Sequence, residues 1–333
     1  MPTLNPGRLI AEIGSVHDGS FGNACKLIEA AASCGAHAVK FQTHIADAES
    51  IAGAPAPAHF SAEDRLPYFA RTAFDEEQWR GLTVVAQEQN VQFLSSPFSL
   101  EAVDLLEKIE VEVYKVPSGE VTNLPLLERI AMTGKPVLLS SGMSSWSELD
   151  AAVSLLREGG SLTIMQCSSV YPCPPERTGL NVICEMRERY GLPVGFSDHT
   201  VGAAIPLAAA ALGATVIEKH FTFSRRMYGS DAQYSMEPEE FSDLAGSLND
   251  VWKALGQPVD KDDLNSYRDM KRIFEKSIVT ARPIDAGAMI TRADMAFKKP
   301  GDGLPPSSRE LLLGRRMSRS LPANHKLSED DFQ

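Results

Sequence analysis

The chain has 333 residues, enough for one large domain and a small one, and its 43% hydrophobic and 23% charged residues are ordinary for a soluble globular protein. The net charge of −12 argues against a nucleic-acid-binding surface, which needs clustered Lys and Arg, although a pocket can still be locally basic. Five cysteines without a Cys-x-x-Cys pair favour reduced thiols in a cytoplasm over a disulfide framework or a structural zinc site.

Neither a secretory nor a membrane segment is expected. Residues Met1–Arg8 carry Pro, Asn and Gly instead of the apolar core of a signal peptide. The longest apolar stretch, Ala203–Leu212, is too short to span a bilayer and contains Pro206. These features predict a cytoplasmic protein that has no membrane partner.

Short apolar or β-branched runs alternate with helix-like amphipathic stretches through the first three-quarters of the chain. This alternation predicts parallel βαβ units, and eight units fit a (β/α)8 TIM barrel better than an open sheet of five or six strands. The eight predicted strands are Leu9–Ile13, Ala38–Phe41, Val91–Ser95, Val111–Lys115, Val137–Ser140, Leu162–Met165, Val194–Ser197 and Thr215–Glu218.

Two regions fall outside the barrel pattern. Asp47–Tyr68 is rich in Ala and Pro and is predicted to be a surface loop near the barrel mouth. We predict a barrel over residues 1–259, a charged linker over 260–276 and a small β-rich domain over 277–333, where turn-forming Pro and Gly separate short apolar runs. So small a domain has a marginal core and should pack on something.

Nearly every predicted strand ends in polar or ionisable residues. The C-terminal ends of barrel strands converge on one mouth, where barrel enzymes place their chemistry. His199 and His220 close neighbouring strands and should therefore meet. One such histidine is more often structural, but a pair of imidazoles suits a borderline divalent cation that keeps open positions for substrate oxygens and water.

Lys40 and Lys115 end the second and fourth strands in a region rich in hydroxyl groups. Each lysine could simply reach solvent, but ammonium and hydroxyl groups together around a mouth make a phosphate site. The hydroxyl-bearing residues are Ser118, Ser140, Ser141, Ser168, Ser169, Tyr171 and Ser197.

Two glutamates join this group. Glu12 ends the first strand and Glu120 follows Ser118, so either could act as an acid or base or orient a sugar hydroxyl. Either could equally be a salt-bridge partner of a lysine at the mouth. A Walker loop, a Rossmann fingerprint and a nucleophile elbow are all missing from the sequence.

The motifs along the chain resemble, in order and over almost its whole length, those of the sialic acid synthase (nonulosonate synthase) family. The segment from Ser277 onward resembles the antifreeze-like SAF domain that follows the barrel in that family. The motifs are Ala11–Gly14, Val39–Thr43, Ser95–Phe98, Tyr114–Glu120, Leu139–Met143, Tyr171–Pro172, Ser197–Thr200 and Glu218–Phe221.

The resemblance implies a transferase of the N-acetylneuraminate synthase type, which joins phosphoenolpyruvate to N-acetylmannosamine or a related amino sugar and releases phosphate by C–O cleavage. His199 and His220 would then hold Mn²⁺, or Mg²⁺ or Co²⁺, to polarise the sugar aldehyde. Glu12, Glu120 and Asp231 would be catalytic, near the aldehyde, the sugar and metal-bound water. The residues implied to bind phosphoenolpyruvate are Lys40, Lys115, Ser118, Ser140, Ser169, Tyr171 and Ser197.

The resemblance also implies a homodimer in which the SAF domain of one subunit caps the active site of its partner. The family motif there is Arg-Pro-Gly-x-Gly, whose Arg reaches the sugar, whereas here Lys299 precedes Pro300. Gln42 and Lys299 are the implied sugar-binding residues. Because Lys and Arg differ at planar contacts, this departure concerns the acceptor sugar more than the reaction.

N-acetylmannosamine is the expected acceptor, and the precursor sugars of legionaminic and pseudaminic acid are the close alternatives. A synthase of the 3-deoxy-ulosonate type that takes a phosphorylated sugar is a second hypothesis, disfavoured by the SAF-like tail. A sugar-binding protein without activity is a third, disfavoured because both histidines and both lysines are present.

Overall fold

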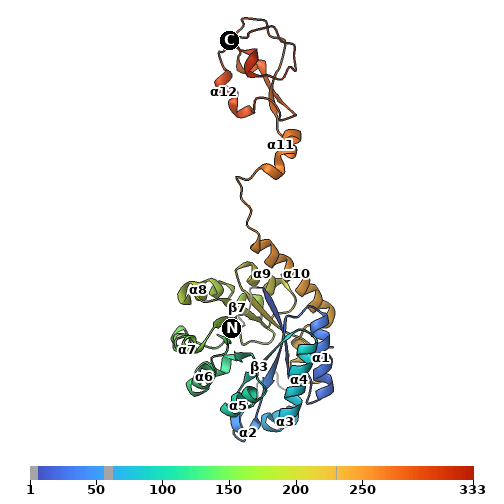
Figure 1. The fold of residues 1–333 in the computed structure, drawn as a ribbon, viewed down its shortest axis with the longest axis vertical. Helices are drawn as coiled ribbons and strands as arrows, with labels where there is room; N and C mark the ends of the chain where they lie inside the picture. The colour runs from blue at the N-terminus through green and yellow to red at the C-terminus, as the bar shows by residue number, and fades with distance from the viewer. Residues whose placement is uncertain (1–6, 56–62, 230) are drawn as a thin grey trace. The chain divides into compact units, whose positions relative to one another are not determined.

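The computed structural model describes residues 7–55, 63–229 and 231–333 (Figure 1). The chain divides into two compact units, Met1–Gln257 and Pro258–Gln333. The first unit holds a closed barrel of eight parallel strands, each paired with the next and the last with the first. The strands are β1 Arg8–Gly14, β2 Ala38–Thr43, β3 Gln92–Pro97, β4 Val113–Val116, β5 Val137–Ser140, β6 Leu162–Cys167, β7 Val194–Asp198 and β8 Val216–His220.

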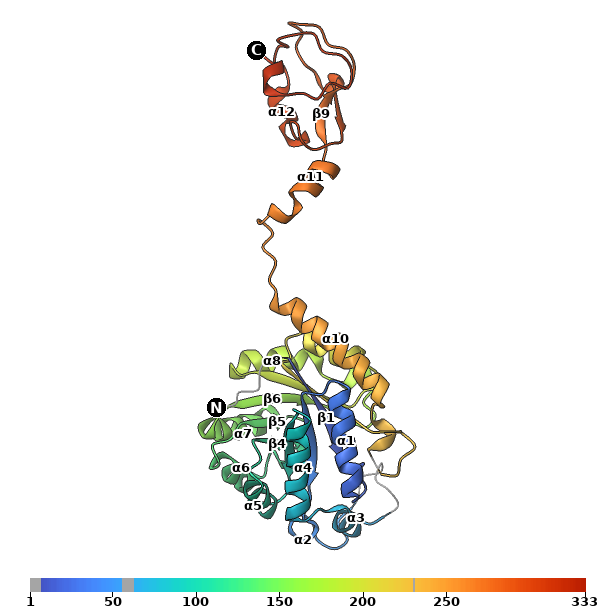
Figure 2. The ribbon, with the colours of Figure 1, turned by 45° about the vertical axis from the view of Figure 1, so that its right-hand side comes forward.

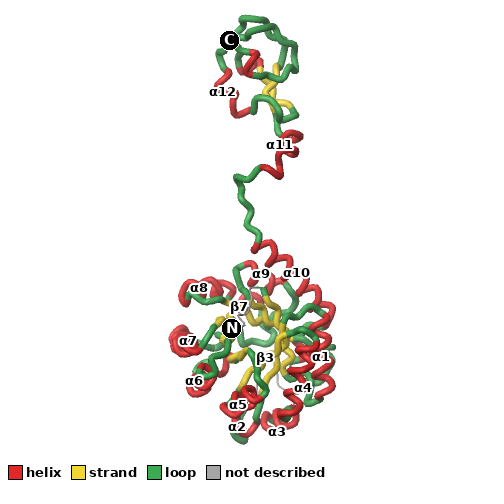
Figure 3. Tube along the Cα trace, in the orientation of Figure 1, coloured by secondary structure: helices red, strands yellow, loops and turns green. Residues whose placement is uncertain are grey.

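Helices form the outer layer around these strands, as the ribbon in Figure 2 and the red helices around yellow strands in Figure 3 show. The predicted TIM-barrel fold with a small β-rich tail is thus confirmed. The helices of this unit are α1 Phe21–Ser33, α2 Ala46–Glu49, α3 Arg65–Thr72, α4 Glu76–Glu88, α5 Leu100–Lys108, α6 Leu124–Ala131, α7 Trp146–Gly159, α8 Leu180–Tyr190, α9 Ala204–Ala211 and α10 Pro238–Gly256.

Strand alternation places an apolar floor and a polar layer inside the barrel. Side chains two residues apart on a strand point to the same face, so a residue two positions after a floor residue also faces the interior. The floor consists of Ile10, Ala38, Leu94, Val113, Leu138, Met165 and Val216. The layer two residues nearer the mouth consists of Glu12, Lys40, Ser96, Lys115, Ser140, Cys167 and Glu218. The sequence therefore builds a closed base beneath a polar mouth.

The second unit has its own apolar core, which includes Ile278, Ile290, Met317 and Leu327. A two-stranded antiparallel sheet pairs β9 with β10 beside this core. The unit's elements are α11 Arg268–Phe274, β9 Ser277–Thr280, β10 Met295–Lys298 and α12 Arg309–Leu312, with short 3-10 turns between them.

Two segments contain helix where the sequence analysis expects a loop or linker. The predicted linker 260–276 contains α11, and the predicted loop Asp47–Tyr68 contains most of α2 and the start of α3. Residues 56–62 of that loop lie outside the described residues. Within the described part of the chain, no helix is long and apolar enough to cross a membrane.

Candidate active site

A cavity of about 380 Å³ opens at the mouth of the barrel, above the polar layer. All eight strands contribute residues to its lining, as expected when the C-terminal ends of barrel strands converge. The lining residues are Glu12, Lys40, Gln42, Ser96, Phe98, Lys115, Pro117, Ser118, Gly119, Ser140, Met143, Cys167, Ser169, Tyr171, Ser197, His199, Glu218 and His220.

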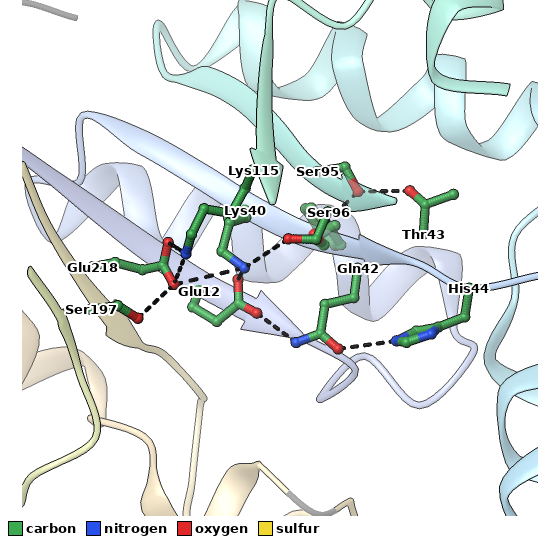
Figure 4. A network of polar contacts seen from close by, with 11 residues as sticks. Glu12, Lys40, Gln42, Thr43, His44, Ser95, Ser96, Lys115, Ser197 and Glu218 are labelled. Carbon is green, nitrogen blue, oxygen red and sulfur yellow. Dashed lines mark hydrogen bonds and ion pairs between the residues drawn. The ribbon is translucent and has the colours of Figure 1, made fainter. Parts of the chain in front are cut away.

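Two buried lysines form the cationic part of the cavity, and each is paired with a buried carboxylate (Figure 4). Lys40 Nζ lies 2.7 Å from Glu12 Oε2 and 3.8 Å from Glu218 Oε1. Lys115 Nζ donates to both oxygens of Glu218, at 2.9 and 2.7 Å. Burial alone would lower the pKa of Lys40, but the charges of Glu12 and Glu218 outweigh it and raise that pKa.

Glu218 joins the two lysines and a serine hydroxyl. Ser197 Oγ donates to Glu218 Oε1 at 3.1 Å. Burial alone would raise the pKa of Glu218, but Lys115 and Lys40 hold it well below its usual value. Glu218 is absent from the predicted site residues. Its signal in the sequence is its position two residues before His220, which puts both side chains on the inner face of β8.

The two predicted metal ligands, His199 and His220, lie side by side, with ring centroids 5.5 Å apart. His199 Nδ1 lies 2.6 Å from the Ser168 carbonyl oxygen, which fixes a hydrogen on Nδ1 and leaves Nε2 bare. Tyr171 packs against the His199 ring at a centroid distance of 4.0 Å. Burial lowers the pKa of both histidines, which favours the neutral imidazole that binds metals.

The donor set fits a divalent cation with open coordination positions. His220 Nδ1 is buried and has no hydrogen-bond partner among the residues that the structure describes. An unsatisfied buried ring nitrogen calls for an explanation, and a metal ion beside His199 supplies one. In that same part of the chain, no group of three or more His, Cys, Asp or Glu side chains is arranged to hold a metal. Substrate oxygens and water would therefore complete the coordination.

Glu12 and Gln42 are joined at the edge of the cavity, and Asp231 lies beside them. Gln42 Nε2 donates to Glu12 Oε1 at 2.7 Å. Gly14, with a φ of 51°, lets Asp231 approach, since a Cβ on Gly14 would lie 2.6 Å from Asp231 Oδ2, 3.4 Å from Gln42 Nε2 and 3.5 Å from Glu12 Oε1. Three polar side chains thus surround one glycine at the end of β1.

Three predicted site residues are not among the described residues that line the cavity. Asp231 lies beside Gly14, as stated. Glu120 accepts a hydrogen bond from Asn123 at 2.7 Å, and burial raises its pKa. Lys299 belongs to the second unit, where its ammonium group lies 4.8 Å from the centre of the Phe274 ring.

Two hydroxyl groups of the predicted phosphate site have structural partners instead. Ser141 Oγ donates to Gln166 Oε1 at 2.9 Å, and Ser168 accepts from Cys173 through its hydroxyl at 3.2 Å while its carbonyl holds His199. Conversely, Ser96, Phe98 and Cys167 line the cavity without having been predicted. The strand alternation that places Lys40 inward also places Ser96 and Cys167 inward, so this signal was present in the sequence.

The NeuB family model matches residues 27–260, and the SAF domain model matches residues 275–333. The N,N'-diacetyllegionaminic acid synthase of Campylobacter jejuni is 35% identical over 330 residues, which cover 96% of this chain and 98% of that protein. The pseudaminic acid synthase of Helicobacter pylori is 30% identical over 337 residues, covering 99% of each.

Among solved structures, the N-acetylneuraminic acid (sialic acid) synthetase of Leptospira borgpetersenii superposes with a TM-score of 0.73 at 31% identity. The match covers 80% of this chain and 91% of that one. The family model, the full-length relatives and the solved structure all match this chain over the barrel, which contains the cavity. The chain therefore belongs to the NeuB family.

Proposed function

We propose that the chain condenses phosphoenolpyruvate with the open-chain form of an N-acylamino sugar and releases phosphate by C–O cleavage. The observation that carries this proposal is one cavity lined by two buried lysines, Lys40 and Lys115, and by two buried histidines, His199 and His220. The names of the relatives support a nonulosonate product. The acceptor is N-acetylmannosamine or a precursor sugar of legionaminic or pseudaminic acid.

The lysines and hydroxyl groups bind phosphoenolpyruvate, whose phosphate and carboxylate are both anionic. Lys115 and Lys40 are held in place before substrate arrives by Glu218 and Glu12, so little reorganisation is needed on binding. The hydroxyl groups of Ser118, Ser140, Ser169, Tyr171 and Ser197 surround this pair and can donate to phosphate oxygens.

In the reaction, C3 of phosphoenolpyruvate forms a C–C bond with the aldehyde carbon. Water adds to the electron-poor C2 and gives up one proton, so that C2 carries a hydroxyl group and the phosphate ester. That hydroxyl group loses its proton as the bond between C2 and the bridging oxygen breaks, which leaves a ketone at C2 and phosphate that keeps the bridging oxygen. One of the two protons ends on the former aldehyde oxygen and the other on phosphate, and we assign the transfer to the aldehyde oxygen to Glu12. Holding both substrates in register supplies much of the rate.

A divalent cation, Mn²⁺ in our proposal, would be held by His199 and His220 and would stabilise the negative charge that develops on the aldehyde oxygen. Burial lowers the pKa of both imidazoles, which favours their neutral form, and the carbonyl of Ser168 orients the ring of His199. The chain's own contribution would be to present His199 Nε2 and His220 to the metal ion in the cavity that we propose for phosphoenolpyruvate.

We also propose that the enzyme is a cytoplasmic homodimer in which the second unit of one subunit covers the cavity of its partner. The match of that unit to the SAF domain supports this arrangement. Lys299, in the position of the family's Arg, would then reach the amino sugar. The ammonium group of Lys299 would offer a point charge to the sugar, whereas the guanidinium group of an Arg offers a planar set of N–H donors.

The proposal is tested by measuring phosphate release from phosphoenolpyruvate with each candidate amino sugar. We expect release only when both an amino sugar and a divalent metal are present, loss of activity with a chelator, and recovery when Mn²⁺ is added back. His220→Ala should reduce turnover by about a hundredfold or more, because it removes one of two metal-holding groups. Chelator-resistant turnover, or full activity of His220→Ala, would remove the metal from the mechanism.

A further inference from the structure

His44, just after β2, has a ring that is fixed from every side. It is stacked between the rings of Phe69 and Phe98, with centroid distances of 3.6 and 4.1 Å and interplanar angles of 18°. Its Nδ1 lies 2.8 Å from Glu49 Oε2, and its Nε2 lies 3.1 Å from Gln42 Oε1 (Figure 4 shows the contact with Gln42). Both ring nitrogens are therefore engaged, and the ring cannot turn without losing these contacts.

The contacts run from Glu12 through Gln42 to His44, and Glu12 decides which atom donates in each hydrogen bond. Glu12 is a carboxylate because its Oε2 is paired with Lys40 at 2.7 Å, so its Oε1 can only accept. Gln42 must then point its NH₂ group at Glu12 Oε1, 2.7 Å away, and its carbonyl oxygen at His44. A carbonyl oxygen also only accepts, so His44 Nε2 must carry a hydrogen.

Glu49 contacts the other ring nitrogen of His44, Nδ1. Its side chain is 3% exposed, and the guanidinium of Arg65 lies 3.9 Å from its Oε1. That oxygen has no hydrogen-bond partner in the described part of the chain. The contact of Nδ1 with Glu49 Oε2 holds the ring in place, whereas the hydrogen on Nε2 is fixed by the carbonyl oxygen of Gln42.

We propose that Glu49 and His44 are positioning residues that lock the carboxamide of Gln42, so that it presents an N–H donor to Glu12 and to the amino sugar. Without them the carboxamide could turn over and present its oxygen, which would repel Glu12 and any acceptor atom of the sugar. The identity of the ligand rests on the proposed function, whereas the hydrogen-bond chain does not. Neither Glu49 nor His44 is proposed to contact the reacting atoms.

The test compares two substitutions of His44. His44→Phe keeps an aromatic ring in the sandwich but removes the Nε2 donor, whereas His44→Gln places an amide nitrogen near the position of Nε2. We expect His44→Phe to raise the KM for the amino sugar about tenfold, the value of one hydrogen bond, with the KM for phosphoenolpyruvate little changed. His44→Gln should restore most of the affinity. His37→Phe, which alters a histidine just before β2, is the control and should leave both constants unchanged.

A second readout does not depend on activity. In ¹⁵N NMR spectra of histidine side chains, assigned by the signal that His44→Gln lacks, His44 Nε2 of the unmodified protein should carry a hydrogen across the neutral pH range. A bare Nε2, or equal sugar KM values for His44→Phe and the unmodified protein, would overturn the proposal. If no amino sugar is turned over at all, the proposed function fails, and the NMR result alone decides whether the positioning chain exists.

Discussion

Gly14 lies at the end of β1, where the geometry of the site leaves no room for a side chain. Its φ of 51° disfavours a Cβ, and a Cβ there would lie 2.6 Å from Asp231 Oδ2. We predict that Gly14→Ala lowers kcat/KM at least about tenfold by displacing Asp231, beyond a backbone cost of about 1 kcal/mol or more. Steady-state kinetics and a urea titration would measure the two effects.

Gly191→Ala is the matched control. Gly191 also has a left-handed φ, 62°, but a Cβ there meets no described atom within 4 Å. The Gly191→Ala variant should lose a similar amount of stability through backbone strain but keep the kcat/KM of the unmodified enzyme. If Gly14→Ala and Gly191→Ala lost equal stability and both kept full activity, the placement of Asp231 beside the cavity would be irrelevant to catalysis.

The sequence predicts which side chains face the barrel mouth better than it predicts which of them form ion pairs with one another. The positions of Lys40, Lys115 and His220 follow from strand ends and the two-residue alternation. The partner of Lys115 does not, because Glu218 lies 103 residues away along the chain. The contact of His44 with Glu49 escapes prediction for another reason, since α2, which carries Glu49, lies in a segment predicted to be a loop.

Among the elements, β7 and β8 carry a buried ion pair on the outer side of the two histidines. Lys219 Nζ lies 2.5 Å from Asp198 Oδ2, with 1% and 0% of the side chains exposed, and also donates to the carbonyl of Thr200. Asp198 in turn accepts from the backbone nitrogen and the hydroxyl of Thr200, at 3.0 Å each. The pair thus ties the turn that follows His199 to the strand that ends in His220.

We predict that Lys219→Met lowers the free energy of unfolding by about 3–5 kcal/mol, because it leaves the Asp198 charge buried and unpaired. Arg189→Met is the control, since Arg189 pairs with Asp150 at 2.6 Å on the surface and such exposed pairs contribute little to stability. Urea denaturation of both variants measures the contrast. Equal losses would mean that the buried pair is no more important than the exposed one.

Element boundaries show where sequence reasoning succeeds and fails. All eight strands were predicted within a few residues, because buried parallel strands are short, apolar and bounded by polar ends. Helix α11 was missed because its charged residues were interpreted as a linker. Lys, Arg and Glu are also good helix formers, so charge density alone does not separate a linker from a solvated helix.

For the whole molecule, the proposed capping of one subunit by its partner makes a prediction about mixed dimers. His220→Ala removes a metal-holding residue of the barrel, and Lys299→Ala alters the second unit, so each variant alone should be nearly inactive. Mixing the two should restore about a quarter of the unmodified activity, since half of the dimers are mixed and each contains one intact site. Activity assays after unfolding and refolding of an equimolar mixture measure this.

No recovery in mixtures that form dimers would place Lys299 in its own subunit's site or outside any site. Recovery would show that the second unit works across the dimer. The sequence suggested this arrangement only through its resemblance to a family, because neither unit's fold carries information on a partner chain.

The proposed reaction joins phosphoenolpyruvate to an amino sugar with C–O cleavage. Phosphoenolpyruvate labelled with ¹⁸O in the bridging position, incubated with the enzyme, metal and the amino sugar, tests it in one mass-spectrometric measurement. We predict that the label leaves entirely with inorganic phosphate and that the product has the mass of the sugar plus pyruvate. Label retained in the product, or phosphate released without a condensed product, would exclude this reaction.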